Sequence, residues 1–152
     1  MASSLEFTSN HLIAMSYGKQ TSSYREMEIQ AASPHKLVVI VFEQLVASLQ
    51  RARLAMERND IQLRVDSVRR ARGLVTELLV TLDVEKGGPL GVELAGHYQV
   101  MLYELMDLGI RNDLTMIGKL LNIATALRDG FAGAAQRLGQ EAPAGRAALM
   151  TA

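Results

Sequence analysis

The dipeptide Ser33-Pro34 and the apolar run behind it constrain this chain more than any other stretch. A serine suits the N-cap of a helix, because its side-chain oxygen accepts a hydrogen bond from a free N–H of the first turn. A proline suits the first helical position, where its missing N–H costs nothing. Every residue from 37 to 42 is apolar, which is more than one stripe of an ordinary amphipathic helix holds. We therefore expect a helix that begins at Pro34 and carries surplus apolar surface.

Behind this junction, apolar residues recur at helical spacing in four segments separated by short breaks. The predicted helices cover residues 34–58, 61–83, 90–108 and 114–138. Asp60 and Asp113 are the expected N-caps of the second and fourth helices, and Gly109 is the expected left-handed residue after the third. Because short connections favour antiparallel neighbours, the predicted fold class is all-α, an antiparallel up-down-up-down four-helix bundle with a mobile N-terminal arm.

Each predicted helix has an inward stripe of apolar or small residues. The four stripes are Leu37, Val41, Leu45, Ser48, Ala52 and Ala55; Ile61, Val65, Val68, Ala71, Val75, Leu78, Leu79 and Leu82; Leu94, Tyr98, Met101, Leu105 and Leu108; and Ile117, Leu121, Ala124, Leu127, Phe131, Ala134 and Leu138. Gly73 interrupts the second helix, where a glycine costs about 1 kcal/mol against alanine. A close approach by a neighbouring helix is the expected reason for it.

The composition divides the chain into three parts. Residues 1–32 are rich in Ser, Thr, Gln and Asn and form the predicted flexible N-terminal arm, part of which docks on the bundle. Residues 33–139 form the bundle, and residues 140–152, rich in Ala, Pro and Gly, form a predicted disordered tail. The chain has no cysteine, and no apolar run approaches the roughly 18 to 20 residues of a membrane span. These features predict a soluble intracellular protein without membrane insertion.

The sequence argues against catalysis and against a metal site or cofactor. No two of the histidines His11, His35 and His97 share a predicted helix, and the inward Glu-x-x-His pairs of a di-iron bundle are absent. Gly87-Gly88 lacks the lysine and hydroxyl residue of a phosphate-binding loop. Arginines outnumber acids between residues 51 and 72, but no helix-turn-helix pattern or interleaved aromatics accompany them. We interpret them as a solvated helix face and expect no nucleic-acid partner.

Two flanks beside the predicted core stripes carry the surplus apolar residues. Helix-in-groove recognition needs exposed apolar surface with adaptable side chains. The candidate binding residues are Val38, Phe42 and Val46 on the first helix and Leu102, Tyr103 and Met106 on the third. The alternatives are that these residues widen the core or form a homodimer seam.

Three ordered blocks resemble one known family. The segment Glu28–Val38 resembles the start of FliS-type flagellin export chaperones, and Leu82–Gly88 looks like that family's loop between its second and third helices. The residues Leu94, Tyr98, Met101 and Leu105, followed by Arg111-Asn112-Asp113, look like its third helix and following turn. The chain departs from the family pattern at Val100, Tyr103, Glu104 and Phe131.

The resemblance implies a non-catalytic chaperone in the bacterial cytosol. Such proteins bind the disordered C-terminal segment of flagellin, prevent its premature polymerisation and help to deliver it to the flagellar type III export gate. In the arm, Tyr17, Tyr24, Met27 and Ile29 are the candidate lid or partner contacts. The alternative is a general helical adaptor or a self-dimerising bundle that has no flagellin client.

Overall fold

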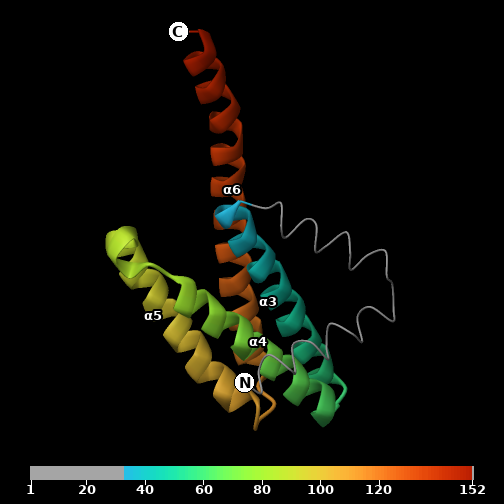
Figure 1. The fold of residues 1–152 in the computed structure, drawn as a ribbon. Coiled ribbons are helices and arrows are strands. Elements are labelled where there is room, and N and C mark those ends of the chain that lie inside the picture. Colours follow the sequence, from blue (N-terminus) through green and yellow to red (C-terminus); the bar gives the residue numbers. More distant parts are fainter. Residues whose placement is uncertain (1–32, 152) are drawn as a thin grey trace, which may run out of the picture. The chain divides into compact units, whose positions relative to one another are not determined.

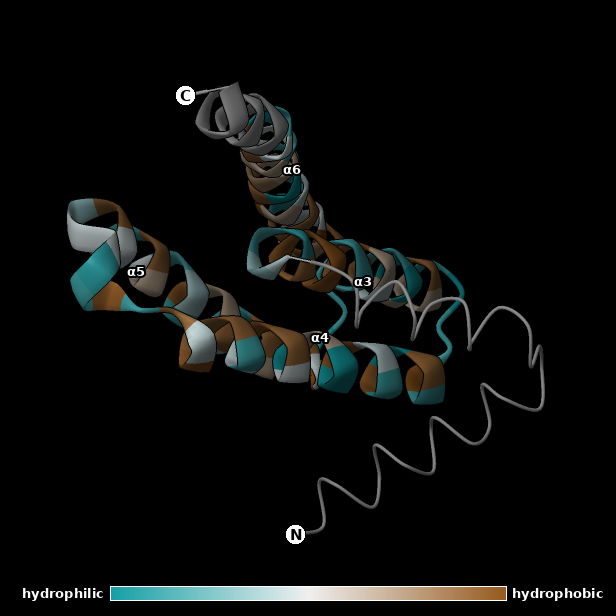
Figure 2. Cartoon of the chain, turned by 45° about the horizontal axis from the view of Figure 1, so that its top comes forward, coloured by the Kyte–Doolittle hydropathy of each residue, from teal (hydrophilic) through white to brown (hydrophobic). Residues whose placement is uncertain are grey.

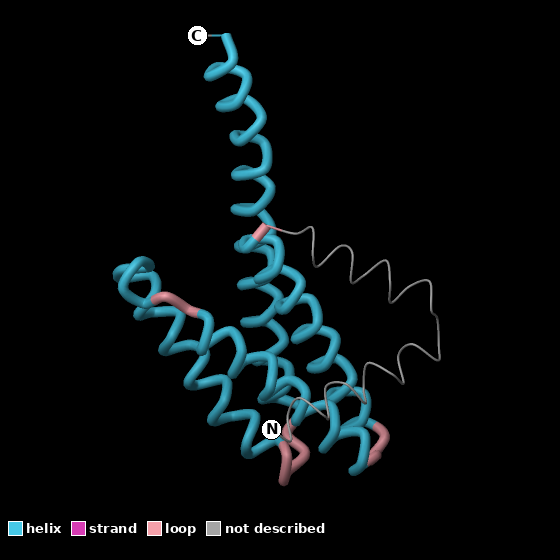
Figure 3. The backbone as a smooth tube through the Cα atoms, viewed as in Figure 1, coloured by secondary structure: helices cyan, strands magenta, loops and turns pink. Residues whose placement is uncertain are grey.

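The computed structural model describes residues 33–151, and residues 1–32 and 152 are not described further. Residues 33–151 form four α-helices joined by short loops and contain no strand (Figures 1 and 3). The helices are α3 (Pro34–Glu57), α4 (Ile61–Thr81), α5 (Val84–Leu108) and α6 (Leu114–Thr151). The predicted all-α fold is therefore confirmed.

The chain divides into two compact units between Leu37 and Val38. Of the first unit, residues 33–37 are described, and they form the start of α3. The Ser33 hydroxyl oxygen accepts a hydrogen bond from the N–H of Lys36 at 3.3 Å, which confirms Ser33 as the N-cap. The second unit holds the rest of α3 and the other three helices.

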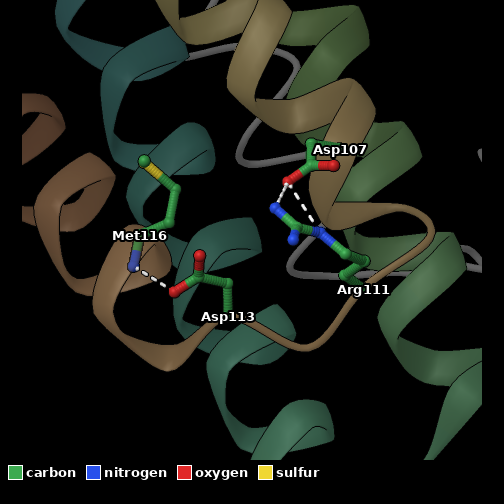
Figure 4. Close-up of polar contacts among 4 residues, drawn as sticks. All are labelled: Asp107, Arg111, Asp113 and Met116. Carbon is green, nitrogen blue, oxygen red and sulfur yellow. Dashed lines mark hydrogen bonds and ion pairs between the residues drawn. The ribbon is translucent and has the colours of Figure 1, made fainter.

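Aspartates cap the other three helices. The carboxylates of Asp60, Asp83 and Asp113 each accept a hydrogen bond from a backbone N–H three residues ahead, at 3.1, 3.1 and 3.0 Å. Figure 4 shows the bond from Met116 to Asp113. A negative charge at a helix N-terminus also interacts favourably with the helix dipole. The caps at Asp60 and Asp113 were predicted, whereas the cap at Asp83 was not.

The start of α5 differs from the prediction. The sequence predicts a start at about Leu90, but α5 begins at Val84 and bends at Gly88. Gly88 has φ 56° and ψ −138°, a conformation open in practice only to glycine. Gly91, in the next turn, packs so closely on Val84 that an added Cβ would lie 3.1 Å from the Val84 carbonyl oxygen. The two glycines thus allow one short helical turn to fold back against the main helix.

Two further boundaries were predicted wrongly. Gly109 is right-handed, with φ −67° and ψ −22°, whereas Asn59, after α3, takes the left-handed conformation with φ 55°. An asparagine tolerates that conformation better than most residues. At the other end of the chain, α6 continues to Thr151, beyond the predicted end at Leu138 and through the predicted disordered tail. The abundance of alanine in this stretch favours helix.

The turn between α5 and α6 carries an exposed ion pair. The carboxylate of Asp107 accepts hydrogen bonds from Nε of Arg111 at 3.2 Å and from its Nη2 (Figure 4). The hydrogen bonds that Arg111 donates to the Asp107 carboxylate raise the pKa of Arg111 above its usual value. The backbone N–H groups of Ile110 and Arg111 both donate to the Asp107 carbonyl at 3.0 Å. These local bonds satisfy carbonyls at the end of α5 without the left-handed residue that was expected there.

One hydrophobic core unites the four helices. Its buried members are Phe42, Leu45, Val46, Leu49, Ala52, Met56, Val68, Ala71, Leu74, Val75, Leu78, Leu94, Tyr98, Met101, Leu105, Leu108, Ile117, Leu120, Leu121 and Ala124. All five residues of the predicted α5 stripe are buried. On α4, Ile61 is exposed and Leu74 is buried instead, because the stripe lies slightly to one side of the predicted line. Leu127 and Phe131 of α6 pack partly buried against the core.

The α3 stripe was predicted correctly only in part. Leu45, Ser48, Ala52 and Ala55 are buried as expected, but Val41 is only partly buried. The centre of the buried face is the line of Phe42, Leu49 and Met56. Leu45 and Ala52 are buried beside this line. The buried Ser48 hydroxyl donates to the Gln44 carbonyl at 2.9 Å. It therefore carries no unpaired donor into the core.

A polar cluster fixes the antiparallel arrangement. Arg64, near the start of α4, donates from Nη1 to the Asn112 side-chain oxygen at 2.6 Å. The Asn112 amide nitrogen donates to the Asn59 side-chain oxygen at 3.2 Å and to the Met56 carbonyl at 3.4 Å. We call Arg64, Asn112 and Asn59 the loop tether. It joins the α3–α4 and α5–α6 turns, so both turns lie at the same end of the bundle, as an up-down-up-down topology requires.

Candidate binding groove between α4 and α5

An exposed apolar stripe follows the outer face of α5. Its large members are Val92, Val100, Tyr103 and Met106. Tyr103 is 73% exposed and Met106 is 58% exposed. At about 100° per residue, these positions lie opposite the buried residues of the same helix. Figure 2 shows hydrophobic colour along α5 interrupted by polar residues. Because a helix with one apolar stripe buries it, this second stripe points to a binding surface.

A groove lies beside this stripe, between α4 and α5, with a volume of about 430 Å³. The two helices pack side by side in the bundle (Figure 1). The groove is lined by Arg69, Arg72, Gly73, Thr76, Leu102 and Met106, which together we call the α4/α5 groove. The α4 residues recur at spacings of three and four and so share one face of that helix. The α5 residues are four apart and contribute the apolar side.

Gly73 leaves the α4/α5 groove open. A close approach by a neighbouring helix was the expected reason for this glycine, and that expectation is wrong. A Cβ added at Gly73 would meet no neighbouring atom within 4 Å. The residue therefore leaves a gap in the α4 surface beside Leu102 and Met106 rather than permitting a tight helix contact.

Positive charge borders the groove. Arg69 forms a loose ion pair with Asp66, with 3.8 Å between Nη1 and Oδ1, and both side chains are largely exposed. No ion pair of Arg72 with a described acidic residue is present. The Thr76 hydroxyl donates to the Arg72 carbonyl at 2.8 Å, so its proton is already used within α4. The side-chain donors that remain for a ligand are those of the arginines.

The structure separates the two predicted binding flanks. Leu102, Tyr103 and Met106 are partly buried or exposed on α5, and Leu102 and Met106 line the α4/α5 groove. On α3, however, Phe42 is 0% exposed and Val46 is 4% exposed.

The prediction that Phe42 and Val46 lie on an exposed flank is therefore wrong. Both belong to the core, and Val38 packs partly buried against it. The error follows from the apolar run of residues 37–42, which offers several parallel stripes of similar hydrophobicity. The spacing of seven between the large residues Phe42, Leu49 and Met56 could have identified the core line.

The residues of the groove missed by sequence reasoning are Arg69, Arg72, Gly73 and Thr76. The arginines were interpreted as part of a solvated face, and Gly73 as a packing residue. In the sequence, their spacing shows that they share one face of α4. It does not show that this face borders a groove, because that depends on the position of α5. The predicted lid or partner contacts Tyr17, Tyr24, Met27 and Ile29 lie outside the described residues.

The remaining polar groups do not assemble a reactive site within the described part of the chain. Residues 33–140, whose side chains are described, include no cluster of three or more potential metal ligands. His97 lies 4.0 Å from Glu93 on the exposed surface of α5. Burial raises the pKa of Tyr98 to about 12, in a core position where its ring packs on Phe42. Among the described helices, none has the length and hydropathy needed to cross a bilayer.

Comparison with known proteins identifies the relatives of this chain. The family model described as "Flagellar protein FliS" matches residues 16–138. The flagellar secretion chaperone FliS of Salmonella typhimurium is 34% identical over 106 residues, covering 66% of this chain and 78% of that protein. The corresponding chaperone of Campylobacter jejuni is 29% identical over 110 residues, covering 72% and 86%.

A third relative agrees with the first two. The flagellar secretion chaperone FliSB of Pseudomonas aeruginosa is 28% identical over 119 residues, covering 76% of this chain and 94% of that protein. The matched region includes α3, α4 and α5, the part of α6 up to Leu138, and both sides of the α4/α5 groove. The chain belongs to the FliS family of flagellar secretion chaperones.

Proposed function

We propose that this protein is a flagellin-specific export chaperone that binds the disordered C-terminal segment of flagellin. The observation that carries the proposal is the exposed apolar stripe of α5 beside the α4/α5 groove, in a member of a flagellar chaperone family. Exposed apolar surface of this kind marks an interaction site more often than a scattered surface leucine does. The residues proposed to contact flagellin are Leu102, Tyr103 and Met106.

The mechanism is coupled folding and binding. A disordered segment that folds on its partner places its apolar side chains on the partner's surface and loses conformational entropy as it does so. On this protein the apolar stripe of the segment packs on Leu102 and Met106, while Tyr103 offers a large ring with a polar end. Once covered, that stripe is no longer available to another flagellin subunit, and premature polymerisation stops.

No catalytic step is part of this function. The protein acts stoichiometrically, as a binding partner that holds one segment until it is handed on. Release at the flagellar type III export gate completes the cycle, and the bacterial cytosol is where both steps take place. A cofactor has no role in this scheme.

Co-expression with flagellin tests the proposal. The full chain should co-purify with full-length flagellin and should fail to co-purify with flagellin that lacks its C-terminal segment. Added in equal amounts to monomeric flagellin, it should suppress filament growth measured by light scattering. Sedimentation that shows only a self-dimer, with no complex at micromolar concentrations, would favour the alternative of an adaptor or dimerising bundle without a flagellin client.

The lid remains part of the proposal. We infer that Tyr17, Tyr24, Met27 and Ile29 cover the binding surface in the free protein and leave it when flagellin binds. Hydrogen exchange on the free and the flagellin-bound full chain measures this directly. Exchange in residues 17–29 should become faster on binding, and equal protection in both states would contradict the lid.

A further inference from the structure

We propose that the α4/α5 groove selects an amphipathic helix whose apolar stripe is flanked by carboxylates, which Arg69 and Arg72 recognise. This inference rests on the proposed chaperone function and adds a rule for which segment is captured. It follows from the chemistry of the two groove walls, one apolar and one basic.

The occupant is helical because of what the groove lacks. An extended peptide that binds by strand addition needs the edge of a sheet, and residues 33–151 contain no strand. The groove is bounded by two helices whose backbone groups bond internally. A helix satisfies its own N–H and C=O groups, so it can lie in such a groove without leaving them unpaired.

The apolar wall sets how the helix is oriented. Leu102 and Met106 are four apart on α5 and present neighbouring side chains to the groove. The gap at Gly73 faces open space, so a side chain of the incoming helix can occupy it. Methionine adapts its shape to different partners, which suits a surface that receives a segment folding as it binds.

The basic wall of the groove determines which charges favour binding when they flank the apolar stripe of the incoming helix. Arg72 has no described acidic partner, and Arg69 has only the loose pair with Asp66. The guanidinium groups present planar forks of donors that match carboxylates. Asp66 partly offsets this charge, yet the two arginines leave the rim positive. A helix with lysines in the same places would meet like charge, which disfavours it.

A charge reversal with a matched control tests the inference. The probe is the flagellin C-terminal segment as a peptide, together with a version in which the acids beside its apolar stripe are changed to amides. Arg72→Glu is the test variant. Arg70→Glu is the control, because Arg70 is also an exposed arginine on α4 but does not line the groove. Thermal melting should show both variants folded, and Arg72→Gln provides a milder change if one is not.

Calorimetry should show that Arg72→Glu weakens binding of the acidic peptide roughly three- to tenfold, in the range of exposed charge pairs and rim contacts. Arg70→Glu should bind as the wild type does. The amide peptide should bind the wild type and Arg72→Glu with equal affinity. Added salt should weaken the acidic-peptide complexes of the wild type and of Arg70→Glu, in which both groove arginines are intact.

The other outcomes separate the two proposals. Equal binding of the acidic peptide by wild type, Arg72→Glu and Arg70→Glu overturns the arginine selection and leaves the chaperone function standing. No binding of either peptide by the wild type overturns both. A dimer of the free protein that Arg72→Glu dissociates identifies a second copy as the occupant, and this also overturns the inference.

Discussion

The ring of Phe42 on α3 stacks on the ring of Phe131 on α6, with 5.3 Å between ring centroids and 21° between planes. The Tyr98 ring of α5 lies 6.3 Å from Phe42 at a tilt of 43°. One aromatic side chain from each of three helices thus meets at Phe42. Such pairs contribute about 0.5–1.5 kcal/mol beyond the area that they bury.

Phe42→Ala should destabilise the protein by about 3–5 kcal/mol, the usual cost of removing a buried phenylalanine ring. The loss has two parts, the apolar contacts of the ring and the cavity left between α5 and α6. Urea unfolding followed by circular dichroism measures it. The control is Glu43→Ala, an exposed neighbour on the same helix, which should change stability by less than about 0.5 kcal/mol. Equal midpoints for the two variants would contradict the core position of Phe42.

Tyr98 should make stability fall in alkali. Burial raises its pKa from 10.0 to about 12, so the unfolded chain releases the phenolic proton at lower pH than the folded chain. The stabilisation from the neutral hydroxyl is complete below pH 10 and is lost as pH rises toward 12. The expected slope between these values is about 1.4 kcal/mol per pH unit.

The Tyr98→Phe variant isolates this effect. Its free energy of unfolding should decline less steeply than that of the wild type between pH 10 and 12. The two proteins differ only in this hydroxyl, so the difference between the two curves reports Tyr98. Parallel curves over this range would show that the hydroxyl ionises as readily in the folded protein as in the unfolded chain.

Asn112→Ala should lower the free energy of unfolding by about 0.5–1.5 kcal/mol, the usual net contribution of a hydrogen bond. It removes one exposed side chain that serves both turns and leaves Arg64 without its shortest partner. Chemical denaturation measures the loss. Asn122→Ala, at an exposed position on α6, is the matched control and should be nearly neutral. A double-mutant cycle of Asn112→Ala with Asn59→Ala should show coupling between them, and strict additivity would mean that the loop tether does not act as a unit.

Gly73→Leu should stabilise the free protein and impair flagellin binding at the same time. A leucine in the interior of a helix is favoured over glycine by about 0.8–1 kcal/mol, and a Cβ at this position meets no neighbour within 4 Å. The longer side chain fills the α4/α5 groove. Gly73→Ala is the control, with a similar gain in melting temperature and a smaller effect on binding. A Gly73→Leu protein that binds flagellin as well as Gly73→Ala does would place the binding surface elsewhere.

The α5 core was predictable from sequence, whereas the α3 core was predictable only in part. On α5, Leu94, Tyr98, Met101 and Leu105 form one regular stripe, and every member is buried. On α3, apolar residues lie on several sides of the helix, so periodicity alone allows more than one inward line. Neighbouring helices decide between these lines, as the rings of Tyr98 and Phe131 do for Phe42.

The groove was only half predictable for a related reason. Leu102 and Met106 stand out because they are apolar residues outside the core stripe of α5. Arg72 and Gly73 look ordinary on an exposed helix, since arginines commonly cover helix surfaces. Their role depends on which residues of α5 lie opposite them, and that pairing is a property of the packed helices rather than of either segment.

The loop tether makes the two ends of the bundle unequal targets for protein engineering. A residue inserted beside Asn112 would shift its amide away from Arg64 and Asn59, so linkers or fluorescent inserts there should disrupt folding. At the opposite end, Gly87 and Gly88 lie in the first turn of α5, where an added Cβ meets no atom within 4 Å. Exposed glycine turns of this kind are the usual places where chains accept insertions. A reporter placed at Gly87 should therefore leave the protein folded, while the tethered end keeps its helices in register.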